Sequence, residues 1–383
     1  MKNILQNISL SFFCLALFLT VNVQAETKPI VKIGWIGPLT GDATYLGVDS
    51  LQILRDRIEL ANSGRSKLGE LPFVIKLLAE DDQYSTKMAL TAYNKLRNSE
   101  GVQIFVVITY GALVSFSERF ARDPVVIIDP LDCDQSIADL SDNIFCIAKK
   151  TEDVGVVLAQ AALKNGVKSP AFLYAQKDQF IPKVVKSAEA TLLDQNVKPV
   201  FSQGVESDIQ DYRDILVRVR KRNPDAVFIL GYDGFGLIMK QARQLGMKQQ
   251  FYSFSSINSP GFKALAGSAV DGTIVVGWSA PRTDLFNSFV AEYKQKYGRG
   301  LYLEVGSVPT YDTADIILEQ LSKQAWSSAE SALDIEEFQA ALYRVRGYQG
   351  ISGEISIDAD GAVRTLRPSL AKFVGGDVVS LKD

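Results

Sequence analysis

The stretch IGWIGPLTGDATYLGVD, Ile33–Asp49, joins an apolar, strand-like run to a helix-like run through a glycine-rich loop. Glycines between a strand and a helix are typical of loops that cradle phosphates, which would make the protein a nucleotide enzyme. The spacing of Gly34, Gly37, Gly41 and Gly47 fits neither the dinucleotide pattern G-x-G-x-x-G nor the P-loop, which needs a lysine after its last glycine. The stretch therefore predicts a tight strand-to-helix turn without a phosphate site.

The same strand-to-helix rhythm continues beyond this loop. Apolar runs separated by helix-like segments predict parallel sheets that are covered by helices on both faces. In the first half, the expected strands are 31–37, 71–81, 102–108 and 124–129, and the expected helices are 47–62, 85–99 and 112–122. The fold class is therefore α/β.

The rhythm restarts near residue 143 and gives a second α/β half. Its expected strands are 143–148, 170–174, 197–201, 225–231 and 273–278, followed by helices over 285–298 and 311–324 and a hairpin around Asp360-Gly361. The late helices lack strands for a third sheet, so they must pack on one of the two halves. We expect two doubly wound lobes, lobe one from 26–148 plus 280–348 and lobe two from 149–279 plus 349–383. A chain that crosses between lobes more than once forms a hinge, with a cleft where ligands bind.

The first 25 residues have the pattern of a secretory signal peptide. Lys2 is followed by the apolar run ISLSFFCLALFLTV and by VQA, a small-residue cleavage site that ends at Ala25. The alternative is a membrane anchor, but the apolar run is short for a bilayer, which needs about 20 residues. We expect an exported, periplasmic protein.

Composition excludes several classes of function. Without the signal peptide, 40 basic residues (41 less Lys2) face 44 acidic ones, a balance that does not suggest nucleic-acid binding. The chain has no histidine, which removes histidine-based triads, histidine general bases and nearly every zinc site. We expect no metal, no cofactor and no enzymatic activity, and a hydrolase built on carboxylates is the least favoured alternative.

Two cysteines, Cys133 and Cys146, remain after the signal peptide. In an exported protein, an even number of cysteines at short separation predicts a disulfide. Such a bridge would add about 3 kcal/mol in the chain-entropy model. The alternative is a pair of buried thiols.

Five segments in order carry a resemblance to a known family. They are VKIGWIGPLTGDATYLG, LAEDDQYSTKMALTAYNKL, DAVFILGYDGFGLIMKQARQLGM, YDTADIILEQL and YQGISGEISIDADGAV. The chain resembles, from about 30 to 375, the type I periplasmic solute-binding proteins of the branched-chain amino-acid group, which serve ABC transporters. The resemblance implies a monomeric Venus flytrap that closes on a small molecule and delivers it to an inner-membrane ABC permease. The alternative is a sensor that presents its closed form to a receptor.

The amino-acid clamp of this family is not visible in the chain. By motif, the family's carboxylate-binding serine falls on Gly111 or Ala112, and its threonine falls on Asp132 and Cys133. Its lobe-two tyrosine falls on Phe180, and its lobe-two acid falls near Ser255. We therefore expect a ligand other than a standard branched-chain amino acid. Asp132 would suit a cationic or hydroxyl-bearing ligand if it faces the cleft, and otherwise it is a hydrated loop carboxylate.

Aromatic residues at the strand-to-helix turns suggest what the cleft holds. Cleft residues of open sheets lie at such turns, and a small, partly apolar or aromatic ligand would be sandwiched there. The aromatic candidates for the site are Tyr45, Tyr110, Phe180 and Tyr232, together with Tyr311 on a late helix. The opening loop then becomes the lobe-one lip of the cleft, with either Tyr45 or Leu46 facing the ligand.

Overall fold

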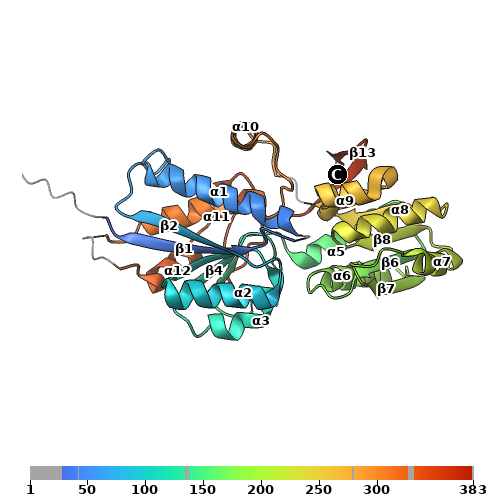
Figure 1. The fold of residues 1–383 in the computed structure, drawn as a ribbon, viewed down its shortest axis with the longest axis horizontal. Helices are drawn as coiled ribbons and strands as arrows, with labels where there is room; N and C mark the ends of the chain where they lie inside the picture. Colours follow the sequence, from blue (N-terminus) through green and yellow to red (C-terminus); the bar gives the residue numbers. More distant parts are fainter. Residues whose placement is uncertain are drawn as a thin grey trace, which may run out of the picture.

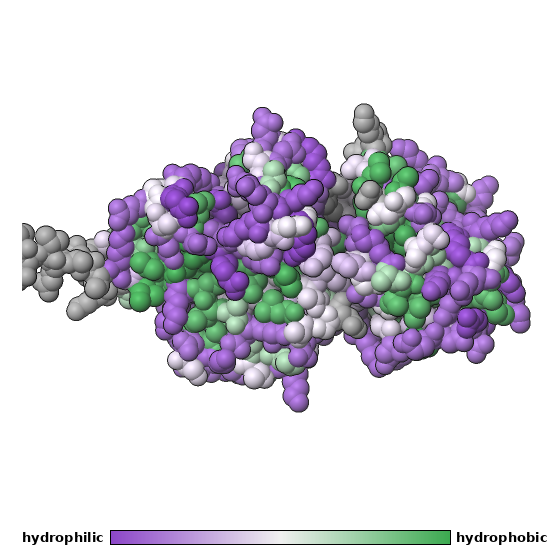
Figure 2. Space-filling model, turned by 45° about the horizontal axis from the view of Figure 1, so that its top comes forward, coloured by the Kyte–Doolittle hydropathy of each residue, from purple (hydrophilic) through white to green (hydrophobic). Residues whose placement is uncertain are grey.

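The structure is a computed structural model that describes residues 28–41, 43–133, 137, 139–277, 280–326 and 332–381. The expected signal peptide and its cleavage site lie outside the described residues. The chain forms two lobes side by side, each a sheet with helices on its faces (Figure 1). In the space-filling view the lobes stay distinct, and hydrophilic side chains dominate their outer surface (Figure 2). The α/β fold class and the two-lobed architecture are confirmed.

Lobe one is built on a parallel sheet in the order β2-β1-β3-β4-β5. Every residue of β3 and β4 is buried, as expected for strands with helices on both sides. The strands are β1 (Ile30–Gly37), β2 (Val74–Asp81), β3 (Ile104–Val107), β4 (Val126–Asp129) and β5 (Ile144–Cys146).

Helices cover the two faces of this sheet. One face carries α1 (Thr44–Asn62), α10 (Asp284–Tyr297), α11 (Ser307–Ser322) and α12 (Ile335–Tyr343), which share one apolar core. The other face carries α2 (Thr86–Asn94), its π-helical extension (Lys95–Ser99) and α3 (Tyr110–Phe120). The late helices α10 to α12 therefore complete lobe one.

Lobe two has the sheet order β14-β13-β10-β9-β8-β6-β7. From β10 to β7 the neighbours are parallel, while β13 and β14 add antiparallel strands at one edge. The strands are β6 (Pro170–Ala175), β7 (Phe201–Val205), β8 (Ala226–Leu230), β9 (Gln250–Phe254), β10 (Ile274–Gly277), β13 (Ser369–Val374) and β14 (Asp377–Ser380). The helices are α5 (Thr151–Lys164), α6 (Ile181–Asp194), α7 (Arg213–Lys221), α8 (Gly236–Gln244) and α9 (Pro260–Ala266), with short 3-10 turns at Asp233–Phe235, Ser255–Asn258 and Gly267–Val270.

The segment after residue 348, which we expected in lobe two, divides between the lobes. The hairpin of β11 (Tyr348–Gly350) and β12 (Gly353–Ile355) packs on lobe one, because Asp312 of α11 accepts hydrogen bonds from the Ile351 and Ser352 amides at 2.8 and 2.7 Å. Only β13 and β14 join the lobe-two sheet. The chain thus passes between lobes after β5, after β10 and before β13.

The predicted disulfide is wrong: Cys133 and Cys146 are both buried thiols that no bridge joins. Strand register explains why. Cys146 lies opposite Asp129, whereas Cys133, four residues further on, lies opposite Lys150. At about 3.3 Å per residue this offset is roughly 13 Å, and a disulfide requires Cα atoms roughly 4.4–6.8 Å apart.

Candidate ligand-binding cleft

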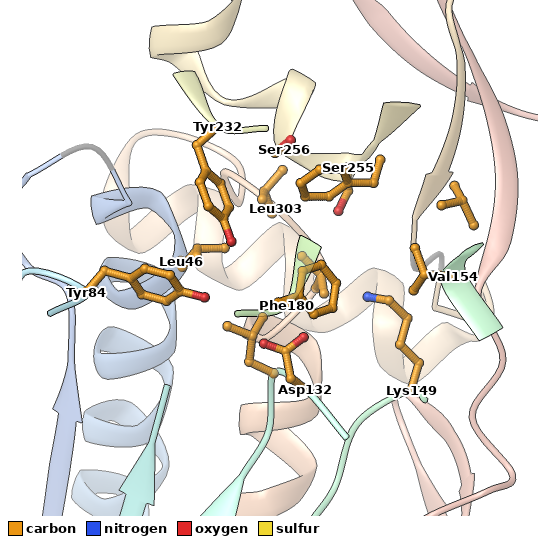
Figure 3. Close-up of a pocket in the computed structure, with 14 residues that line it drawn as sticks. Leu46, Tyr84, Asp132, Lys149, Val154, Phe180, Tyr232, Ser255, Ser256 and Leu303 are labelled. Carbon is orange, nitrogen blue, oxygen red and sulfur yellow. The ribbon is translucent and has the colours of Figure 1, made fainter. Parts of the chain in front are cut away.

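A pocket lies between the lobes, next to the strands that connect them (Figure 3). About 440 Å³ of space between atoms lies within its lining, part of it open solvent. Its lining is mostly apolar, with a few polar groups. The lining residues are Leu46, Tyr84, Leu131, Asp132, Lys149, Val154, Phe180, Tyr232, Phe254, Ser255, Ser256, Val276, Leu303 and Val305.

The two sheets bring these residues together because most of them follow a parallel strand. Tyr84 follows β2, Asp132 follows β4, Tyr232 follows β8 and Ser255 follows β9. The carboxyl ends of parallel strands meet at one edge of a sheet, so each lobe presents one such edge to the cleft. Lys149 comes from the hinge strand between β5 and α5.

The glycine loop that opens the chain forms the lobe-one lip of this cleft. Asp81, at the end of β2, accepts hydrogen bonds from the Leu39 amide at 2.8 Å and the Thr40 hydroxyl at 2.6 Å. These bonds fix the turn into α1, whose first turn carries Leu46 into the pocket. Tyr45 is buried and lies near the tyrosines 84 and 232, whose pKa values it helps to raise, but it does not line the pocket.

Tyr84 and Tyr232 meet across the mouth of the cleft. Their rings contact edge to face with centroids 5.9 Å apart (Figure 3). Tyr232 also donates to Asp178 Oδ2 at 3.0 Å, while Asp178 Oδ1 accepts from the Phe180 and Ile181 amides at 2.8 and 2.6 Å. Burial, reinforced by nearby carboxylates, raises the pKa of both tyrosines well above its usual range, so both are neutral.

Asp132 and Lys149 place one negative and one positive charge in the pocket wall. Both side chains are buried, and the Lys149 amine points into the pocket (Figure 3). Burial lowers the pKa of Lys149 to about 8, although the negative charge of Asp132 opposes that shift. The pair gives the cleft a polar floor that can meet both an acceptor and a donor on a ligand.

Several residues proposed from the sequence lie outside the pocket lining. Tyr110 packs on Phe180 with centroids 6.1 Å apart, beside the cleft, and Gly111 lies next to the side chains of Thr86 and Gln179. Ala112 and Cys133 are buried in the core. Tyr311 packs on Phe289 and under Arg57, 4.2 Å from its ring centroid, among residues of α1 and α10. Of the proposed residues, the structure brings Leu46, Asp132, Phe180, Tyr232 and Ser255 together.

Sequence reasoning missed three of the polar lining residues, Tyr84, Lys149 and Ser256. Tyr84 follows Gln83, and both adopt a positive φ, 56° and 53°, held by Asp82 Oδ1 and Asp81 Oδ1, which accept from their amides. The pattern DDQYS, with two acids before a strand-to-helix turn, is the signal that could have found Tyr84. Lys149 lies in a hinge strand without a motif, and only the crossing of the lobes places it in the cleft.

Within the described residues, no group of three or more cysteine, aspartate and glutamate side chains is arranged to hold a metal ion. None of the described helices has the length and apolar character needed to cross a membrane. The polar groups of the pocket lining are two tyrosine hydroxyls, two serines, one carboxylate and one amine.

Two hinged α/β lobes with a pocket between them define a protein of the bilobal solute-binding class. The model of the periplasmic binding protein family matches residues 30–367, and the chain belongs to this family. Membership in this family supports the interpretation of the chain as a periplasmic solute-binding protein of the kind that serves ABC transporters. It confirms the family resemblance that the sequence carries.

Three relatives illustrate the likeness. The chain is 24% identical over 369 residues to Leu/Ile/Val-binding protein homolog 2 of Brucella abortus, covering 95% of both chains. A leucine binding protein of Thermotoga maritima has a TM-score of 0.79 at 21% identity, covering 92% of this chain and 98% of the other. A benzoate complex of an ABC-transporter solute-binding protein of R. palustris has a TM-score of 0.76 at 18% identity, covering 92% and 95%.

Proposed function

We propose that the protein is the solute-binding component of an ABC importer and captures a small molecule in the cleft between its lobes by hinge closure. The pocket carries this proposal, because lobe one, lobe two and the hinge all contribute to its wall. A ligand that touches both lobes binds the closed form more tightly than the open form, so it shifts the equilibrium toward closure. A permease would then recognise the closed form, and no bond is made or broken.

The lining favours a ligand with a compact apolar or aromatic body. Phe180 and Phe254 pack edge to face at 6.1 Å, with aliphatic side chains around them. Aromatic contacts of this kind add about 0.5–1.5 kcal/mol beyond the buried area. That a structural neighbour binds benzoate supports an aromatic ligand for this fold.

The positions of the family's α-amino-acid clamp carry other residues in this chain. Where the family clamp has a serine, the chain has Gly111 or Ala112, and where the clamp has a threonine, the chain has Asp132 and Cys133. We therefore propose a ligand other than leucine, isoleucine or valine. Stabilisation of the protein by leucine at micromolar concentration would contradict this part of the proposal.

Native mass spectrometry of the exported protein tests capture directly, because a tightly held solute appears as added mass. Leu46→Trp fills the pocket from α1, and Leu285→Trp makes the same change on α10, where Leu285 is about half exposed. We expect the added mass with the wild type and with Leu285→Trp, and its loss with Leu46→Trp. Equal occupancy in all three proteins would place the solute elsewhere and refute the cleft as the site.

A further inference from the structure

The side chain of Lys149 places a free amine in the wall of the cleft. Only 7% of the residue is exposed, and its amine points into the pocket beside Val154 (Figure 3). Among the described residues, no hydrogen bond or ion pair engages this amine, and Asp132 acts on it only through its negative charge. A buried ammonium group without a hydrogen-bonded partner is costly, so burial favours the neutral amine.

Backbone contacts hold the strand that carries Lys149. The next residue, Lys150, lies opposite Cys133 in an isolated bridge, and the Thr151 amide donates to the Cys133 carbonyl at 2.6 Å. Before Lys149, the Cys146 amide donates to the Gly361 carbonyl at 2.9 Å. The amine is therefore presented to the pocket from a hinge strand that two other segments keep in place.

A neutral amine in an apolar pocket is a nucleophile. With a pKa of about 8, half of the Lys149 amine is neutral at pH 8, against roughly one part in 300 for a lysine with the ordinary pKa of 10.5. A neutral amine condenses with the carbonyl group of an aldehyde in water, whereas it does not react with a carboxylate, an amide or an alcohol under the same conditions. Lys149 is therefore equipped to react with an aldehyde.

From this placement we infer that the cleft captures small apolar aldehydes as a reversible imine on the Lys149 nitrogen. The inference goes beyond the noncovalent capture proposed above and rests on it only for the cleft as the place where the solute binds. A neutral aldehyde suits the wall better than a carboxylate does, because a carboxylate would meet the negative charge of Asp132 as well as the Lys149 amine.

The reaction is a condensation that releases one water. The lone pair of the Lys149 nitrogen bonds to the carbonyl carbon, the carbonyl π pair moves to the oxygen, and one proton passes from nitrogen to that oxygen. The resulting hydroxyl leaves as water with the second proton of the nitrogen, and a C=N bond remains. The Asp132 carboxylate, in the same lining, can accept and return these protons. Nothing is oxidised or reduced, and hydrolysis releases the aldehyde unchanged.

Reductive trapping tests this step with two named aldehydes. The protein is incubated at pH 8 with benzaldehyde or 3-methylbutanal and with sodium cyanoborohydride, which reduces the imine to a stable secondary amine. Peptide mass spectrometry then locates the added benzyl or 3-methylbutyl group. We expect Lys149 to be labelled at least about tenfold faster than Lys150, which is partly exposed and does not line the pocket. Its larger neutral fraction outweighs the lower nucleophilicity of a less basic amine.

Lys149→Arg separates covalent capture from ionic binding. Arginine keeps the positive charge, but its guanidinium stays protonated and forms no imine. Lys150→Arg is the matched control, because it makes the same change at the next residue, outside the pocket lining. We expect the fast labelling to disappear in Lys149→Arg and to persist in Lys150→Arg, with circular dichroism showing that both variants fold.

The inference is overturned if Lys149 of the wild type is labelled no faster than Lys150, a comparison that needs no variant. Equally fast labelling of the Lys149→Arg protein also overturns it. So does binding of benzoate to both the wild type and Lys149→Arg without labelling by either aldehyde, because the amine then serves an ionic contact. None of these outcomes touches the proposed function, which fails if native mass spectrometry finds no captured solute.

Discussion

Gly47→Ala tests how the glycine-rich loop between β1 and α1 positions the cleft. A Cβ atom at residue 47 would lie 2.0 Å from the Pro38 carbonyl oxygen and 2.9 Å from its carbon. These are backbone atoms of a rigid residue at the end of β1, so they cannot turn aside as a flexible side chain would. The carbonyl or the start of α1 must therefore move by more than about 1 Å, since buried atoms pack at about 3.5 Å.

The magnitude follows from two opposed effects. Overpacking in a well-packed site costs about 1–3 kcal/mol, and an obstacle made of backbone belongs at the upper end of that range. Alanine returns about 1 kcal/mol through its higher helix propensity. The expected loss is about 2 kcal/mol, which lowers the melting temperature by about 4–8 °C in a domain of this size.

Thermal unfolding followed by circular dichroism measures this loss. Gly300→Ala is the control, because a Cβ atom there meets nothing within 4 Å and the position has no positive φ. Since Leu46 precedes Gly47, the shift of α1 should also weaken capture of the solute. If the Gly47→Ala protein has the same melting temperature as the wild type and as Gly300→Ala, the close packing of this turn is refuted.

Three further predictions follow from buried groups. Burial raises the pKa of Asp82 to about 6 against the hydrogen bonds from Thr109 and the Tyr84 amide, so the folded protein holds this proton more tightly than the unfolded chain. The resulting contribution to the free energy of unfolding, about 3 kcal/mol, is present below pH 4 and is lost as the pH rises to 6. Asp82→Asn should remove this pH dependence from the free energy of unfolding measured in urea. Parallel pH profiles for the wild type and the variant would contradict the prediction. Burial lowers the pKa of Lys149 to about 8, so the folded protein holds this proton less tightly than the unfolded chain. The contribution of Lys149 to the free energy of unfolding is therefore complete above the ordinary lysine pKa of 10.5 and is lost as the pH falls toward 8. The wild type should therefore gain up to about 3 kcal/mol over Lys149→Met between pH 8 and 10.5, and a constant difference would argue against the burial of this amine. Finally, Cys133 and Cys146 are buried thiols, so a thiol reagent should react with them only after the protein is unfolded. No reductant should be needed for this reaction. Failure to react in denaturant without a reductant would indicate a disulfide.

The architecture could be predicted from the sequence because its signal is local. Continuous apolar runs such as residues 102–108 and 124–129 are typical of strands with helices on both sides, and both became buried parallel strands. The position of the cleft followed from the rule that ligands meet the carboxyl ends of such strands. Phe180 and Tyr232 were found in this way, whereas Leu46 came from the resemblance to the family.

What the sequence could not predict depends on contacts between distant segments. The disulfide failed because spacing along the chain does not give strand register, which holds Cys133 opposite Lys150. Tyr311 is on a predicted helix, but only the packing of α11 on α1 shows that its ring lies under Arg57 and not in the pocket lining. Lys149 reaches the cleft because the hinge crosses there, which no pattern in the sequence marks.

The central claim is that a solute closes the two lobes, and a distance between them measures it most directly. Glu118 on α3 and Lys186 on α6 are both exposed, one on each lobe, whereas Cys133 and Cys146 are buried and should not react with a label. Electron-electron double resonance on spin-labelled Glu118→Cys/Lys186→Cys protein should give a shorter and narrower distance distribution when the captured solute is added to solute-free protein. The same distribution with and without bound solute would contradict capture by hinge closure.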